Sequence, residues 1–146
     1  MWGFSDVIAG SIFVVLTLVA LFHLYWAAGG RWPGVDEKSL SRTVIGARGI
    51  AAMPPAWLTV VVAMLIFLAG LFPIAWTRGV PALVPPWLLT AGMAGLTLIF
   101  ILRGVASYSH VFRKSNCEEP FATLDQRFYG PLCLVLGTGY LLLLVR

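Results

Sequence analysis

The amino-acid sequence predicts an all-α protein, a four-helix transmembrane bundle, and three observations carry that prediction. Hydrophobic residues make up 60% of the 146 residues and charged residues only 11%, whereas a soluble domain has roughly 45–50% and about 25%. The apolar residues are gathered into four long runs. Most of the charged residues and most of the prolines lie between these runs. We therefore expect a single membrane domain over residues 1–146.

The four predicted helices cover about residues 7–28, 56–76, 87–107 and 126–145. Each is close to the length of about 20 residues that crosses a hydrocarbon core of roughly 30 Å. Lipid offers no partners for backbone N–H and C=O groups, so these spans are expected to be helical. The third apolar run begins near Val80, but Pro81, Pro85 and Pro86 place the start of its helix near Trp87.

The first apolar run resembles a signal peptide in its position, but its flank argues for a retained helix. Residues 1–5 contain no lysine or arginine, and Asp6 is acidic. A signal peptide has a basic start and a shorter apolar core. We expect the run to remain as the first transmembrane helix.

Positive charge predicts the orientation of the bundle. Eight lysines and arginines fall in or beside the two longer loops: Arg31, Lys38, Arg42, Arg48, Arg103, Arg113, Lys114 and Arg127. Only Arg78 and Arg146 fall at the opposite ends of the helices. The positive-inside rule then places both termini on the outer side and the two longer loops in the cytoplasm. Tryptophans near the span ends, such as Trp2, agree with a multi-pass protein of the bacterial inner (cytoplasmic) membrane.

The first loop, residues 29–55, allows two interpretations. Apolar and basic side chains alternate through its middle: Lys38, Leu40, Arg42, Val44, Ile45, Arg48 and Ile50. This pattern is compatible with a short helix lying on the cytoplasmic surface. An irregular, solvated loop between the glycines at its start and Pro54–Pro55 accounts for the composition equally well.

A polar cluster is predicted where helices 1 and 3 end and helix 4 begins. Its members are His23, Tyr25, Trp26, Arg103, Ser107, Asp125 and Tyr129. Arg103 and Ser107 share a helix face, and Arg103 and Asp125 are the expected ion pair, because charges near bilayer depth face inward and pair. Thr123 or Asp125 is the expected N-cap of helix 4. One interpretation is polar packing between helices, and the other is a site for a headgroup or small anion.

Other chemistries are weakly supported. His23 and His110 are candidate haem ligands from helices 1 and 3, but His110 lies seven residues beyond Arg103 and outside the expected bilayer. No other cofactor and no metal site is predicted, and Cys117 and Cys133 are expected to be free thiols. The basic residues form no stripe with interleaved aromatics, so nucleic acid is not an expected partner. Glycine pairs in helices 3 and 4 are expected to allow close helix approach: Gly92, Gly95, Gly137 and Gly139.

Two stretches carry a resemblance to a known family. One is His23-Leu24-Tyr25-Trp26-Ala27-Ala28-Gly29-Gly30. The other runs from Arg103 through Phe112-Arg113-Lys114 and Pro120-Phe121-Ala122-Thr123-Leu124-Asp125 to Tyr129-Gly130-Pro131-Leu132-Cys133-Leu134. Together they resemble the bacterial integral membrane family catalogued as domain of unknown function 3995. The resemblance covers nearly the whole chain and implies a four-helix membrane protein, without a cofactor or substrate. Ser107-Tyr108 stands where the family pattern has Asp-Phe, so no acid is expected at that point.

Two classes of function follow. The favoured hypothesis is a protein that binds a lipid-like or amphiphilic ligand, or an accessory subunit of a membrane complex, with membrane lipids, a larger complex or self-association as partners. The alternative is a membrane enzyme or small-molecule transporter that uses the polar site near the cytoplasmic face. Because no catalytic motif is found, an enzyme is the less favoured class and no catalytic residue is assigned.

Overall fold

The computed structural model of the protein describes residues 3–79 and 84–146, so Trp2 and Pro81 lie outside the described residues. Every regular element in these ranges is helical. In chain order they are α1 (Phe4–Ala27), α2 (Glu37–Val44), α3 (Ala56–Arg78), α4 (Pro86–Ala106), α5 (His110–Ser115), α6 (Phe121–Leu124), the π-helix η1 (Asp125–Tyr129) and α7 (Gly130–Leu144). The all-α prediction is confirmed.

Within the described residues, four helical segments are long and apolar enough to cross a membrane. They are α1, α3, α4 and the continuous segment Phe121–Leu144, which joins α6, η1 and α7. Large apolar side chains on their outer faces are exposed, with Leu65 and Ile99 each 60% exposed. Such surfaces are unfavourable in water and suited to lipid. The prediction of a multi-pass membrane protein is thereby supported on length, composition and surface.

The start of the fourth span differs from the prediction. The helix begins at Phe121, and Pro120 occupies the N-cap, so the prediction of Thr123 or Asp125 as N-cap was wrong. The Glu119 carboxylate accepts a hydrogen bond from the Thr123 backbone N–H at 3.2 Å, which satisfies one of the free donors of the first turn. The uninterrupted apolar run begins later than the helix because Asp125, Gln126 and Arg127 follow its first turn.

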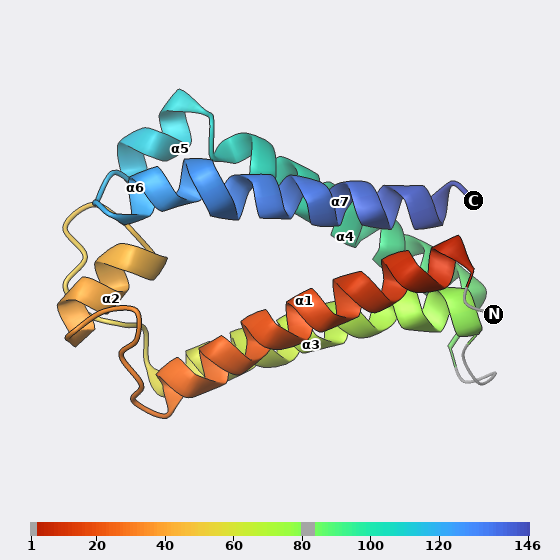
Figure 1. Cartoon of the computed structure of the whole chain (residues 1–146), viewed down its shortest axis with the longest axis horizontal. Helices are drawn as coiled ribbons and strands as arrows, with labels where there is room; N and C mark the ends of the chain where they lie inside the picture. The colour runs from red at the N-terminus through yellow and green to blue at the C-terminus, as the bar shows by residue number, and fades with distance from the viewer. Residues whose placement is uncertain (1–2, 80–83) are drawn as a thin grey trace.

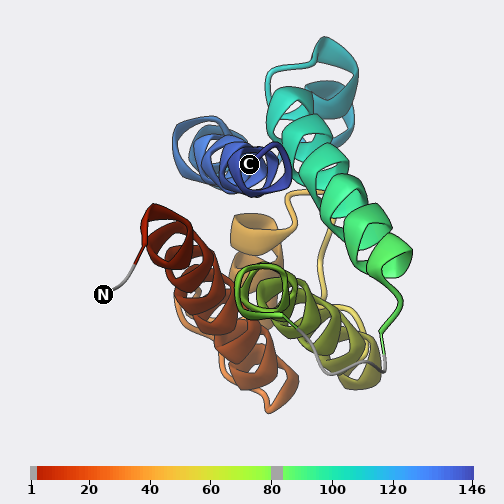
Figure 2. The same ribbon diagram turned by 90° about the vertical axis from the view of Figure 1, so that its right-hand side faces the viewer.

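The four long helices form two hairpins (Figures 1 and 2). In the first hairpin α1 packs along α3, and in the second α4 packs along α7; packing between the hairpins is much less extensive. Figure 1 shows the hairpins converging where the chain ends lie and separating toward α2, α5 and α6. We call these the termini end and the loop end. Which side of a membrane the loop end faces stays a prediction.

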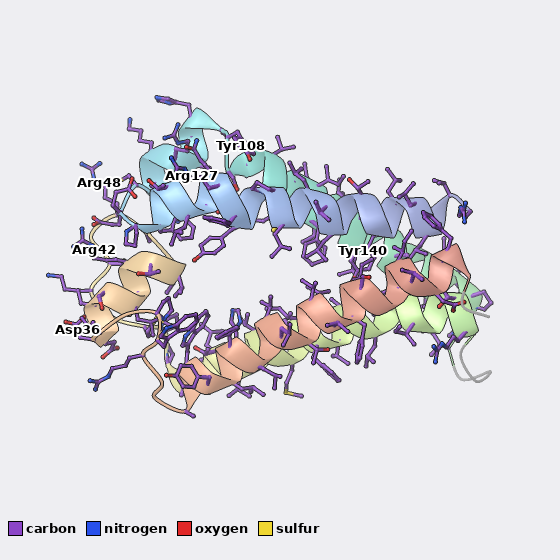
Figure 3. All side chains as sticks on the ribbon, viewed as in Figure 1. Asp36, Arg42, Arg48, Tyr108, Arg127 and Tyr140 are labelled. Atoms are coloured by element: carbon purple, nitrogen blue, oxygen red, sulfur yellow. The ribbon has the colours of Figure 1, made fainter. Side chains whose placement is uncertain are left out.

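At the termini end the hairpins are joined by hydrogen bonds to main-chain carbonyls. Pro73, inside α3, has no N–H, so the carbonyl of Ala69 lacks its usual partner four residues later. The hydroxyl of Tyr140, which is fully buried on α7, donates to that carbonyl at 2.7 Å. Trp76 Nε1 donates to the Leu143 carbonyl at 2.8 Å. Figure 3 shows Tyr140 between the two hairpins.

At the loop end the connecting segments pack on each other. Between the two sequence interpretations of the first loop, the structure has the helix, α2, whose Leu40 and Ser41 are buried. Asp36 caps it by accepting from the Ser39 backbone N–H at 2.7 Å. Gly46 follows at φ +65°, and a Cβ there would overlap the Phe121 ring. The first loop is therefore held closely against the start of the fourth span.

The expected close approach at glycine is confirmed for three of the four named positions. A Cβ at Gly92 would overlap Phe72, one at Gly137 would overlap Ile101, and one at Gly139 would lie 3.0 Å from Ile12. Gly95 has nothing within 4 Å of such an atom. Both cysteines are free, as expected.

Candidate functional site

The predicted pairing of Arg103 and Asp125 is present at the loop end of the second hairpin. Arg103 Nη2 lies 2.5 Å from Asp125 Oδ1, and Arg103 Nη1 donates to Ser107 Oγ at 2.7 Å. Ser107 is fully buried and the Asp125 side chain is 4% exposed, whereas the Arg103 side chain is 33% exposed. The buried partners thus anchor the guanidinium of a side chain that is itself only partly buried.

Two glycines bring the helices that carry this cluster together. A Cβ at Gly104 would lie 3.0 Å from the Gly130 carbonyl oxygen, and a Cβ at Gly130 would lie 2.8 Å from Ser107 Cβ. The backbones of α4 and the fourth span therefore meet at this point.

The π-helix η1 sits at the same point and has a local cause. Pro131 has no N–H and would crowd the carbonyl of Arg127 in a regular α-helix. The chain instead widens by one residue, and the Gly130 N–H donates to the Asp125 carbonyl. Such single-turn widenings occur frequently at functional sites.

Side chains from neighbouring elements complete the surroundings. Arg103 Cζ lies 4.8 Å from the centroid of the Phe112 ring on α5. Tyr129 does not bond to Arg103: its hydroxyl donates to the Thr43 carbonyl of α2 at 3.4 Å, and its ring packs at 5.8 Å from that of Phe121. Tyr129 therefore links the second hairpin to the first loop.

The other three predicted residues form a separate group at the end of α1. His23 Nδ1 is 2.8 Å from the Val19 carbonyl within its own helix. Trp26 Nε1 donates to the Trp32 carbonyl at 2.8 Å, and the Tyr25 hydroxyl accepts from the Trp32 N–H at 3.4 Å. The sequence placed all seven residues at one depth, but the structure divides them between two hairpins that separate toward this end (Figure 1).

The sequence analysis missed the contacts that hold the two loops together. Arg42 Nη2 lies 2.8 Å from Glu118 Oε2, and the Gly49 N–H donates to Glu118 Oε1 at 3.1 Å. Asn116 Nδ2 donates to the Ile45 carbonyl at 3.2 Å. Figure 3 shows Arg42 and Arg48 at this edge of the molecule. Nothing in the sequence relates positions about 70 residues apart, so only the tertiary structure reveals this contact.

The contact is expected to be sensitive to acid. The backbone hydrogen bond from Gly49, followed by the charge of Arg42, lowers the pKa of Glu118 below its ordinary value of 4.5, against an opposing effect of desolvation. A carboxyl with a lowered folded-state pKa contributes stability above its unfolded pKa and loses it as the pH falls through the lowered value. Protection of the Gly49 amide from hydrogen exchange should therefore be intact at pH 6 and fall below about pH 4.

Glu118→Gln should show the lower protection already at pH 6. The Ile50 amide, which donates to the Ala47 carbonyl within the same loop, is the internal control. A Gly49 protection factor that is equal at both pH values in the natural protein would contradict the expectation.

The histidines proposed for haem belong to different parts of the molecule. His23 lies on α1 of the first hairpin, and His110 begins α5, on the far side of the second hairpin in Figure 1. Among residues 3–79 and 84–146, no three His, Cys, Asp or Glu side chains are grouped as metal ligands would be. The geometry of the described residues offers no argument for a metal or haem site.

Comparison with known proteins places the chain in a family. Residues 16–140 match the family model described as "Protein of unknown function (DUF3995)". No curated protein and no solved structure matches the chain. The match covers most of the 146 residues, including the ion pair and most of each hairpin. The chain, with its four apolar spans, therefore belongs to the DUF3995 family.

Proposed function

We propose that this protein binds an anionic amphiphile in the bacterial inner membrane, with Arg103 as the residue that receives the ligand's polar group. The supporting observation is the incomplete use of the Arg103 guanidinium. It has five N–H donors, and one each on Nη1 and Nη2 goes to Ser107 and Asp125. One third of the side chain is exposed, and we place the ligand oxygen at the donors that Ser107 and Asp125 do not use.

The surroundings suit a ligand that is polar at one end and apolar at the other. Leu102 and Val105, which flank Arg103 on α4, are 57% and 55% exposed. In a bilayer these side chains contact acyl chains while the guanidinium extends toward the headgroup region. Asp125 neutralises part of the cationic charge, so affinity is expected to come mainly from directed hydrogen bonds to a planar fork.

An enzyme or transporter acting through His23, Arg103, Asp125 and Tyr129 is less well supported. Such a mechanism needs these groups around one ligand. His23 bonds within α1, and Tyr129 bonds to the first loop. The anchored guanidinium favours retention of a ligand over conversion of one.

The test is mass spectrometry of the gently purified protein, first native and then denatured, on the natural chain and on Arg103→Lys. Lysine keeps the charge opposite Asp125 but lacks the planar fork, so the fold should persist while a bound amphiphile is lost. Arg42→Lys, at the other ion pair of the loop end, is the matched control and should retain it. Equal retention in all three proteins would contradict the proposal, and a co-purifying polypeptide in place of an amphiphile would identify an accessory subunit instead.

A further inference from the structure

A hollow at the loop end, formed by α5, the segment that follows it and α6, is lined mainly by basic and polar side chains. Its volume is about 550 Å³, within the range of roughly 300–1,000 Å³ typical of small-molecule sites. It is lined by His110, Arg113, Lys114, Cys117, Glu119 and Ala122. None of these residues belongs to the polar cluster that the sequence predicted.

The basic lining follows from helical spacing. His110, Arg113 and Lys114 are at positions i, i+3 and i+4 of α5, so they share one face of the helix. Phe112 lies on another face and contacts Arg103. The short helix α5 therefore separates the hollow from the Arg103 cluster.

The charges in this hollow are available to a ligand. The salt bridges found among the described residues are Arg42–Glu118 and Arg103–Asp125, so neither Arg113 nor Lys114 is neutralised by one. The lining also includes the Glu119 carboxylate, which accepts from the Thr123 backbone N–H; its negative charge offsets part, but not all, of the charge of the two cations.

Arg113 is also held in place. When the Gln126 amide is oriented to satisfy its neighbours, its oxygen accepts from Arg113 Nη1 and Nε at 3.1 and 3.2 Å. The main-chain carbonyl of Gln126 in turn accepts from the Tyr108 hydroxyl at 3.0 Å. Three of the five guanidinium N–H donors remain free of these contacts, and the side chain is positioned before a ligand arrives.

We propose that this hollow binds a phosphoryl group, carried by a lipid headgroup or by a soluble phosphate. A guanidinium fork, an ammonium and an imidazole together offer more charge and more donors than a single carboxylate requires. A phosphoryl group presents up to three acceptor oxygens and nearly two negative charges near pH 7. The inference does not rest on Arg103 binding an amphiphile, because the two sites share no residue.

The experiment uses the full chain in uncharged detergent micelles. Binding of phosphatidic acid is measured by native mass spectrometry as a lipid titration, with phosphatidylcholine as the zwitterionic comparison. The test variant is Arg113→Gln/Lys114→Gln. The matched control is Arg31→Gln/Lys38→Gln, which removes the same charge from exposed positions of the first loop, outside the hollow.

Two charge-assisted contacts are lost in the test variant, so phosphatidic acid should bind at least about tenfold more weakly. The control variant should bind with nearly the natural affinity. Arg103→Lys should also leave this binding unchanged, which distinguishes failure of this site from failure of the proposed function.

A repeat of the titration with excess inorganic phosphate separates the two sources. Displacement of the lipid assigns the hollow to a phosphoryl group in general, and persistence of the lipid assigns it to a headgroup. Equal weakening in the test and control variants would overturn the proposal, because it would show general attraction to a basic surface. Absence of phosphatidic acid binding by the natural chain, together with no protection by inorganic phosphate against unfolding, would overturn it as well.

Discussion

Replacement of Arg103 by methionine is expected to destabilise the folded protein by about 3–5 kcal/mol, the cost of leaving a buried charge without its partner. The Asp125 carboxylate is only 4% exposed and cannot reach water once the guanidinium is gone. Ser107 loses its donor at the same time.

The reverse substitution should be milder, and this asymmetry is the sharper part of the prediction. In Asp125→Asn the remaining charge is Arg103, which is 33% exposed and long enough to reach the headgroup region. We expect a loss of about 1–2 kcal/mol. The double variant Arg103→Met/Asp125→Asn should be more stable than Arg103→Met alone, because no unpaired charge remains.

The measurement is the free energy of unfolding of the natural chain and three variants in mixed detergent micelles. If Asp125→Asn proves the more damaging single change, the carboxylate is not the buried partner and the description of this pair is wrong. If the double variant is stable but no longer retains the co-purifying amphiphile, the pair is needed for ligand binding and not for packing. That result would support the proposed function.

Loss of the Tyr140 hydroxyl is the second large expected effect. Tyr140→Phe removes the donor to the Ala69 carbonyl while leaving a ring to stack on Phe100, whose centroid lies 5.5 Å away. A buried main-chain carbonyl without a partner costs about 1–3 kcal/mol. In lipid there is no water to replace the lost donor.

Pro73 provides a direct check of this explanation. In Pro73→Ala the new N–H can donate to the Ala69 carbonyl within α3, as in any α-helix. Tyr140→Phe should then cost much less in that background than in the natural chain, a coupling that a double-mutant cycle measures. Tyr108→Phe, which removes a hydroxyl from a half-exposed ring, is the control and should have a small effect in both backgrounds. An equal cost of Tyr140→Phe with and without Pro73 would contradict the prediction.

The sequence predicts the spans well because hydropathy and length determine them. A bilayer requires about 20 apolar residues per helix, and each of the four runs meets that requirement. The pairing of Arg103 with Asp125 was also predictable, because two opposite charges at one depth of a membrane protein have few alternatives. The contact between Arg103 and Ser107 was predictable as well, because residues four apart share one face of a helix.

The sequence does not determine how residues at one depth are arranged laterally. His23 was expected near Arg103 because each lies near the end of its helix on the same side of the bundle. The hairpins diverge at that end, so His23 bonds within its own helix and Arg103 bonds to Asp125. The basic face of α5 carried a recognisable spacing, at His110, Arg113 and Lys114, but the two cations were attributed to orientation and the histidine was considered only as a haem ligand. The bond between Tyr140 and Ala69 requires knowledge of which helices pack together, although Pro73 indicates that one carbonyl of α3 needs a new partner.

The pairing of each long helix with its nearest long neighbour in sequence has a consequence for biogenesis. Because α1 finds its main partner in α3, and α4 finds its main partner in α7, most contacts are local and their loop-closure entropy is small. The first hairpin has all of its internal contacts once residues up to Arg78 have been synthesised. Insertion can therefore proceed as two successive helical pairs, and the joining of those pairs through Tyr140 and Trp76 is the late step of assembly.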